Sequence, residues 1–119
     1  YDLVSLLRDC YVAWPEERVR GWALGYAERA ARAGIIEAVE AERFLRWFDW
    51  MGLQRHIKVL GIFARLWLRD GKPGYLRDLP LVMRYTTTVA ARYPQTRPFA
   101  AWFARAVQPL AERQDWYRA

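Results

Sequence analysis

The chain has 119 residues, of which 54% are hydrophobic and 16% aromatic. This size fits one domain with a buried core, and the aromatic content excludes an intrinsically disordered chain. The single cysteine, Cys10, excludes a disulfide scaffold and favours a reducing compartment, so we expect a cytoplasmic protein. The net charge of +6 is compatible with an anionic partner and equally with a plain soluble domain.

The sequence begins at Tyr1, and a helical pattern follows at once. We therefore expect a piece of a longer protein that carries no signal peptide. Every apolar run is interrupted by a charge before it reaches about 18 residues, which predicts neither a membrane span nor a membrane partner.

Helical periodicity extends over nearly the whole sequence, and no segment alternates with the period of a strand. The first predicted helix covers about residues 3–14 and ends before Pro15. Its apolar residues recur every three or four positions, whereas Arg8 and Asp9 fall on the opposite, polar side.

Five more predicted helices follow the proline, which gives an all-α bundle of about six helices. The first three are expected at about 16–33, 36–51 and 53–70, and each ends at the glycine that follows it, Gly34, Gly52 or Gly71. The fourth is expected at about 80–93. The fifth, at about 97–108, has Thr96 as its cap and ends or kinks near Pro109. The tail adds a short turn. We treat residues 1–119 as one helical subdomain.

The fourth of these helices, residues 53–70, is apolar on most of its sides, so we place it at the centre of the bundle. His56, the only histidine, shares a face with Leu60 and Trp67. It is expected to be buried and hydrogen-bonded, with a carboxylate such as Asp9 or Asp49 as the partner.

Glycines inside the predicted helices indicate close packing. Gly61 lowers the helix propensity by about 1 kcal/mol relative to alanine, so we expect the backbone of another helix to approach it. Gly21 and Gly25 have the spacing that lets two helices pack closely.

The sequence holds no complete catalytic set. It has no G-x-G-x-x-G or Walker loop, and His56 and Cys10 form neither a catalytic pair nor a metal site. The segment 49–52 resembles a kinase metal-binding turn only superficially. Asp49 is explained equally well as an ordinary polar residue at the end of a helix. We predict no catalytic residue, no cofactor site and no metal site within this chain.

Hydrogen-bond donors gather at the start of the fourth predicted helix, at Gln54, Arg55, His56 and Lys58. Together with the positive end of the helix dipole they suit a hydroxyl-rich or anionic ligand. The alternative is a solvated helix start with one core histidine. The other basic residues are scattered, so we expect no nucleic-acid partner.

Three segments carry a resemblance to a known family: DWMGLQRHIKVLGIFARL at 49–66, YDLVSLLRD at 1–9 and DGKPGYLRDLP at 70–80. Together they resemble the helical C-terminal lobe of the aminoglycoside phosphotransferase-like kinases. Within that family they are similar to the bacterial branch that phosphorylates the anomeric hydroxyl of cell-wall amino sugars, N-acetylmuramate and N-acetylglucosamine, in peptidoglycan recycling.

The resemblance implies that the chain is the acceptor-binding part of an ATP-dependent sugar kinase. The parent kinase would hold ATP and Mg²⁺ in an N-terminal nucleotide-binding lobe and a catalytic loop, and this sequence contains neither. His56 is followed by Ile57 and Lys58, so it does not make the His-x-Asp catalytic loop. We therefore expect the chain alone to be inactive, and its partners to be the missing lobe and a small sugar.

Residue type and position indicate how the acceptor sugar is held. The substrate-binding candidates are Asp9, Asp49, Trp50, Arg55, His56 and Lys58. The carboxylates would accept sugar hydroxyl groups, and the indole would offer an aromatic face. Arg55 or Lys58 would meet the lactyl carboxylate of a muramic acid.

Two other functions stay open: an autonomous helical module that binds a protein through exposed aromatic residues, and, as the weaker alternative, nucleic-acid binding by the Arg-rich surface. If the chain is a fragment, an apolar patch is left exposed on it. We expect this patch at Leu3, Leu7 and Tyr11 or around Trp116, covered in a homodimer of the isolated chain.

Overall fold

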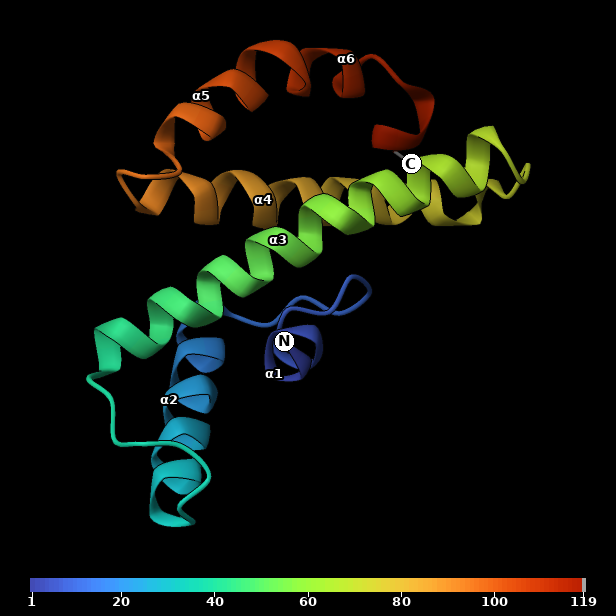
Figure 1. Cartoon of the computed structure of the whole chain (residues 1–119). Helices are drawn as coiled ribbons and strands as arrows, with labels where there is room; N and C mark the ends of the chain where they lie inside the picture. The colour runs from blue at the N-terminus through green and yellow to red at the C-terminus, as the bar shows by residue number, and fades with distance from the viewer. Residues whose placement is uncertain (119) are drawn as a thin grey trace. The chain divides into compact units, whose positions relative to one another are not determined.

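The computed structural model describes residues 1–118, and all regular elements in this range are helices. In chain order they are α1 (Asp2–Leu7), α2 (Glu16–Arg32), α3 (Ala41–Leu68), the 3-10 helix η1 (Pro73–Asp78), α4 (Leu79–Arg92), α5 (Arg97–Ala106), α6 (Gln108–Glu112) and the 3-10 helix η2 (Asp115–Tyr117) (Figure 1). The all-α prediction is confirmed. None of the described helices is long and apolar enough to cross a membrane.

The contacts divide the chain into two units, Tyr1–Gly52 and Leu53–Ala119, and the boundary falls inside α3. Each unit has buried clusters of its own. The single subdomain expected for residues 1–119 is not tested by this division and stays a prediction.

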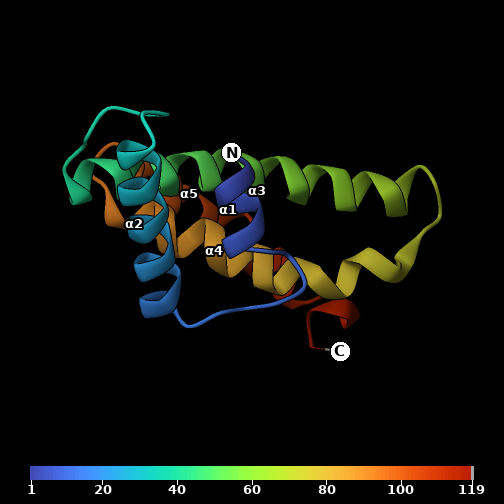
Figure 2. The same cartoon turned by 90° about the horizontal axis from the view of Figure 1, so that it is seen from below.

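The core of the first unit forms where α1 and α2 pack together and against the first half of α3. Figure 2 shows α1 and α2 side by side, joined by the irregular segment 8–15. Cys10, within this segment, is buried as well. The buried members of the core are Val4 and Leu7 of α1, Val19 and Ala23 of α2, and Leu45 and Phe48 of α3.

The first helix ends at Leu7, well before the proline that was expected to stop it. Arg8 leaves the helical region, with φ −116° and ψ 60°. The Asp9 carboxylate then accepts the backbone N–H groups of Tyr11 and Val12, at 2.5 and 3.2 Å. This local turn competes with a helix for the backbone donors, so the apolar periodicity does not extend the helix.

The helix α3 is continuous where two helices were predicted, so the expected stop at Gly52 is wrong. A glycine ends a helix readily when its φ turns positive, and among residues 1–118 this happens at Gly34 and Gly71, with φ 72° and 64°. Those two predicted stops are confirmed. At the first of them, the N–H of Ile35 donates to the Ala30 carbonyl at 2.9 Å, which closes α2.

Gly52 permits a close contact instead of a turn. A Cβ built on Gly52 would lie 2.7 Å from Cγ2 of Val4, nearer than carbon atoms pack. Val4 is 1% exposed and belongs to the core, so it has no room to move. The close approaches predicted at Gly61 and at Gly21 and Gly25 are wrong, because a Cβ at any of these positions meets nothing within 4 Å.

The second unit is built around α4, which contacts η1 and α5. One buried cluster joins Leu53 of α3 to Val89 and Ala90 of α4, and the other joins Met83, Phe103 and Ala111 of α4, α5 and α6. The threonine run at 86–88 stays helical as predicted. The Thr86 and Thr87 hydroxyls donate to carbonyls of their own helix at 2.9 and 3.0 Å, which satisfies them inside it.

The predicted sixth helix is split at Val107 into α5 and α6, with Pro109 in the first turn of α6. Thr96 occupies the predicted cap position of α5. Its hydroxyl nevertheless donates to the Ala90 carbonyl at 2.7 Å and makes no cap hydrogen bond, so the capping role is wrong. The short turn predicted for the tail is η2.

Residues 53–70 were predicted to be buried on most sides at the centre of the bundle, but only one face of this helical segment is buried. His56 is fully buried, as predicted. In contrast, Ile57, Trp67 and Leu68 are 42%, 44% and 81% exposed. Periodicity shows that these positions are apolar, but no described element covers them, so the prediction of a helix surrounded on most sides is wrong.

The exposed apolar residues near the first helix are not the ones that were predicted. Tyr11 is exposed, but Leu7 is buried in the core and Leu3 is half-buried against it. Leu6 takes the exposed position on α1 instead. Trp116 is half-buried against the second unit's core.

We predict opposite effects for two glycine-to-alanine substitutions in α3. Gly61→Ala should raise the free energy of unfolding by about 0.5–1 kcal/mol through helix propensity alone. Gly52→Ala should lower it by about 1–2 kcal/mol, since the new Cβ collides with Val4. Urea denaturation followed by circular dichroism measures both, and equal shifts would contradict the close contact.

Candidate functional site

The most strongly held polar group of the first unit is the Arg8 guanidinium, which is buried directly after α1. Its Nη1 donates to Oδ1 of Asp49 at 2.6 Å, and its Nη2 donates to Oε1 of Glu16, also at 2.6 Å. Its central carbon lies 4.8 Å from the ring centroid of Phe48. One cation therefore connects the end of α1, the first residue of α2 and the middle of α3.

Three of the six substrate-binding candidates lie in this unit. Asp49 is buried, with a side chain only 5% exposed, and accepts from Arg8. Asp9 is half-buried and organises the turn after α1. Trp50 is half-buried, and the guanidinium carbon of Arg46 lies 5.6 Å from its ring centroid. These residues share one neighbourhood through Arg8, which directly precedes Asp9 and binds Asp49.

The other three candidates lie on α3 in the second unit. His56 is completely buried, and its ring stacks on Tyr85 of α4, with centroids 4.8 Å apart and planes 20° from parallel. Arg55 is half-buried, and Lys58 is exposed. Residues that are two positions apart along a helix differ in direction by about 200°, so Lys58 and His56 point in nearly opposite directions. The predicted donor cluster is therefore separated into a core group and a surface group.

Two residues next to the candidates were missed. Arg8 was assigned to the polar face of the first helix, and the structure corrects this, because the side chain is buried. A signal was present: Asp49 stands between Phe48 and Trp50, and a carboxylate placed in such an apolar segment requires a cation. Tyr85 left no comparable signal, since ring stacking across two helices has no local pattern.

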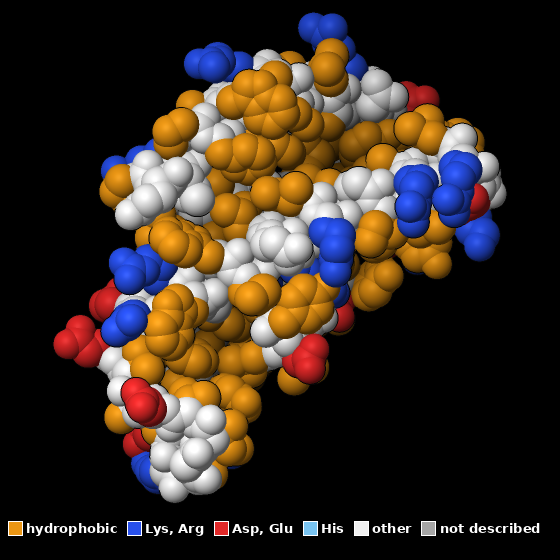
Figure 3. Space-filling view, in the orientation of Figure 1, with side chains coloured by type: hydrophobic (Ala, Val, Ile, Leu, Met, Phe, Trp, Pro, Cys, Tyr) orange, Lys and Arg blue, Asp and Glu red, His pale blue; other side chains and the backbone are white. Residues whose placement is uncertain are grey.

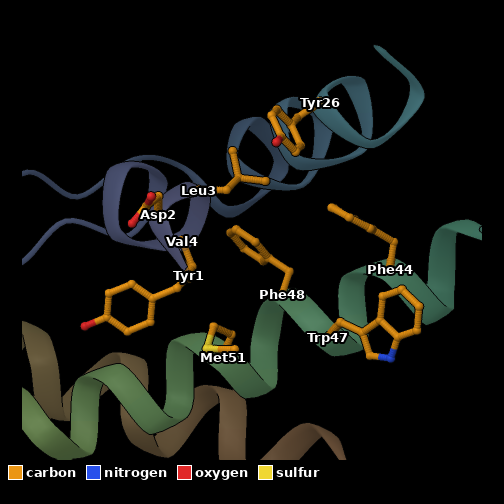
Figure 4. Close-up of a pocket in the computed structure, with 9 residues that line it drawn as sticks. All are labelled: Tyr1, Asp2, Leu3, Val4, Tyr26, Phe44, Trp47, Phe48 and Met51. Carbon is orange, nitrogen blue, oxygen red and sulfur yellow. The ribbon is translucent and has the colours of Figure 1, made fainter. Parts of the chain in front are cut away.

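A hollow of about 370 Å³ opens in the first unit between α1, α2 and α3. Figure 4 shows Leu3 and Phe48 directed toward each other, with Tyr26 of α2 and Trp47 of α3 at the sides. The lining is mostly aromatic, and Asp2 supplies its one carboxylate. None of the six candidates lines this hollow.

The second unit has a groove of about 580 Å³ between the second half of α3 and helices α4 to α6. Almost every residue that lines it is apolar, and Figure 3 shows hydrophobic side chains gathered around it. Arg55, His56 and Lys58 do not line it. These two hollows are therefore lined by residues other than the six predicted sugar-binding candidates.

We predict that removing one partner of the buried ion pair is far more damaging than removing both. Arg8→Met should lower the free energy of unfolding by about 3–5 kcal/mol, because it leaves the Asp49 carboxylate buried without its cation. Adding Asp49→Leu should restore part of the loss. Glu16→Gln should change it by about 1 kcal/mol or less, because that side chain is half exposed.

A double-mutant cycle in urea measures this coupling. If the decreases in the free energy of unfolding caused by Arg8→Met and by Asp49→Leu simply add in the double variant, the buried pair is unimportant. Glu16→Gln serves as the matched control, since it removes an equally short contact of the same guanidinium at the surface.

Curated relatives with one common name, N-acetylmuramate/N-acetylglucosamine kinase, match nearly the whole chain. The relative from Neisseria meningitidis is 46% identical over 107 residues, which are 90% of this chain and 32% of that protein. The relative from Pseudomonas aeruginosa is 50% identical over 95 residues, or 80% of this chain and 28% of that protein. The relative from Caulobacter vibrioides is 41% identical over 114 residues, or 96% and 29%.

No protein-family model matches the chain, and no solved structure matches it. The chain spans about a third or less of these relatives, between 28% and 32% of their length. Within the matched residues the identity is 41–50%. This chain is therefore homologous to a segment of proteins named N-acetylmuramate/N-acetylglucosamine kinase.

Proposed function

We propose that the chain is the C-terminal, acceptor-binding part of an ATP-dependent kinase that phosphorylates the anomeric hydroxyl of N-acetylmuramate and N-acetylglucosamine. The observation that carries this proposal is the identity of 46% over 90% of the chain with a kinase named for both sugars. The place of such an enzyme is the cytoplasm, in peptidoglycan recycling.

The two sugars differ by a lactyl carboxylate, which only the muramic acid carries, and the proposed site has groups for it. Arg55 and Lys58 are three residues apart on α3, so their side chains are neighbours on the helix surface. Lys58 is exposed, whereas Arg55 is half-buried and its Nε atom is buried, so the Lys58 ammonium is the more accessible of the two groups. Two adjacent cations favour a carboxylate over a neutral hydroxyl.

The remaining candidates divide into contacts and supports. Within the first unit, taken by itself, we assign direct sugar contacts to Asp9, which is half-buried beside the turn after α1, and to the ring of Trp50. Asp49 and His56 are buried against Arg8 and Tyr85, so we assign them the role of holding their neighbours in place.

ATP and Mg²⁺ belong to the whole kinase in this proposal. Residues 1–118 contain no group of three or more His, Cys, Asp or Glu side chains arranged to hold a metal. No step of the transfer is assigned to the described side chains. Phosphoryl transfer depends largely on positioning, and orienting the acceptor hydroxyl is the contribution that a helical segment can make.

We predict that the chain binds both amino sugars and that the muramic acid depends on the surface cations. Lys58→Gln should weaken N-acetylmuramate about two- to fivefold, as expected for one exposed ion pair, and leave N-acetylglucosamine unchanged. Arg105→Gln on α5 is the matched control, because it removes an exposed cation elsewhere. Ligand-observed NMR titration measures the affinities, and no binding of either sugar would contradict the acceptor-binding role.

We also predict that the purified chain neither hydrolyses ATP nor phosphorylates either sugar. The sequence has no phosphate-binding loop and no His-x-Asp catalytic loop, so the groups that bind and activate the nucleotide are missing. Incubation with labelled ATP and each sugar tests this. Turnover that follows the amount of chain added would contradict it.

The isolated chain is further predicted to self-associate. Its exposed large apolar side chains include Leu6, Tyr11, Leu68 and Leu110, which are 60–81% accessible. A monomeric soluble protein rarely leaves such side chains gathered in large patches. Light scattering at micromolar concentration should give a dimer or larger particle, and a clean monomer of 14.1 kDa would contradict this.

A further inference from the structure

We propose that Glu16, the first residue of α2, is a further contact of the acceptor sugar, and that the buried Arg8 side chain orients its carboxylate for this task. This inference rests on the proposed function, because it adds a residue to the sugar contacts of the first unit. The contact is a hydrogen bond that a sugar hydroxyl donates to a carboxylate oxygen. Glu16 is not one of the six candidates that the sequence indicated.

The Glu16 carboxylate is anchored to a buried group. Its Oε1 accepts a hydrogen bond from Nη2 of Arg8 at 2.6 Å. The Arg8 side chain is only 3% exposed, donates through Nη1 to Asp49 at 2.6 Å, and lies 4.8 Å from the ring centroid of Phe48. A carboxylate that is already bonded to a packed donor has less rotamer freedom to lose when a ligand binds. Glu16 is thus oriented before any sugar arrives.

The core of the first unit does not require this second carboxylate. The Asp49 side chain is 5% exposed and already places a negative charge against the Arg8 cation, whereas the Glu16 side chain is 50% exposed. A buried cation is costly without a buried partner, and Asp49 meets that need. An ion pair with a half-exposed partner adds little stability. Stability alone therefore gives little reason for a glutamate at the start of α2.

The segment that leads from Arg8 to Glu16 carries other groups that suit a sugar. Trp14 is 42% exposed, and its ring meets Trp22 of α2 at 5.3 Å between centroids and 85° between planes, which supports its position. Small-molecule sites combine aromatic side chains with a few fixed polar groups. Asp9, already proposed as a sugar contact, directly follows Arg8 in the chain. Both carboxylates are therefore attached to the same buried residue, Asp9 by the backbone and Glu16 by a hydrogen bond.

Charge decides which part of the sugar Glu16 contacts. The lactyl group of N-acetylmuramate is attached through the oxygen on carbon 3 and carries a negative charge, which a glutamate carboxylate repels. The anomeric hydroxyl is the group that receives the phosphoryl group in the proposed reaction. We therefore assign to Glu16 a hydroxyl that both sugars share, on carbon 4 or carbon 6. Such a contact raises the affinity for both sugars without distinguishing between them.

The experiment compares Glu16→Gln with Glu17→Gln in the full chain, by ligand-observed NMR titration with each sugar. Both substitutions remove one acidic residue from the first turn of α2, so they change the net charge and the interaction with the helix dipole in the same way. Glu17 is exposed and lies about 100° around the helix from Glu16. We expect Glu16→Gln to weaken both sugars by the same factor, about fivefold. Glu17→Gln should change neither affinity by more than about twofold.

Deoxy sugars separate a direct contact from an effect on the surrounding structure. The 4-deoxy and 6-deoxy derivatives of N-acetylglucosamine each lack one of the two hydroxyls that Glu16 could bind. The derivative without the contacted hydroxyl should bind the unsubstituted chain more weakly, and Glu16→Gln should not weaken it further. The other derivative should still lose about fivefold. A glutamate that only supports the structure would affect both derivatives equally.

Four results would overturn the assignment of Glu16. They are an unchanged affinity in Glu16→Gln, equal effects of Glu16→Gln and Glu17→Gln, equal losses for the two deoxy sugars, and a Glu16→Gln variant that does not fold by circular dichroism. An unsubstituted chain that binds neither sugar contradicts the acceptor-binding role itself, and this contact with it. A chain that binds both sugars but is insensitive to Glu16→Gln contradicts this contact alone, so the two failures are distinguishable.

Discussion

The first unit depends on one buried cation. Three helical elements meet at the Arg8 guanidinium, which binds two carboxylates at 2.6 Å and lies over an aromatic ring. Arginine suits this position better than lysine, because its planar fork can bind two acceptors in different directions.

The regular structure could largely be predicted because it depends on patterns along the sequence. Apolar spacing predicted the helical class, and Gly34 and Gly71 marked two helix ends through their positive φ. Gly52 looked identical in sequence, but its role is set by Val4, a residue that is distant along the chain. Whether a glycine turns the backbone or admits a neighbour is decided by tertiary contacts, which local patterns do not contain.

Exposure was harder to predict than element type for a related reason. Periodicity shows which face of a helix is apolar, and it identified His56 as a core residue. It does not show whether another element lies over that face, so Trp67 and Leu68 were assigned to the core although they are exposed. For the candidate site, residue type selected Asp49 as a carboxylate for sugar hydroxyl groups, which stays a prediction, and its partner Arg8 became evident only from the fold.

The polar candidates and the aromatic hollow differ in chemistry. The cations on α3 suit a small charged ligand, whereas the hollow has a single carboxylate and a rim of large apolar side chains. A sugar needs many hydrogen bonds, and a packed polypeptide needs apolar area with few charges.

The burial of Cys10 and His56 gives each unit its own chemical reporter. The chain has one cysteine and one histidine, Cys10 in the first unit and His56 in the second, and they are 4% and 0% exposed. A thiol reagent reaches Cys10 only when the first unit opens, and a histidine-modifying reagent reaches His56 only when the second does. The native sequence therefore allows the opening rates of the two halves to be followed separately in one sample, without any introduced label.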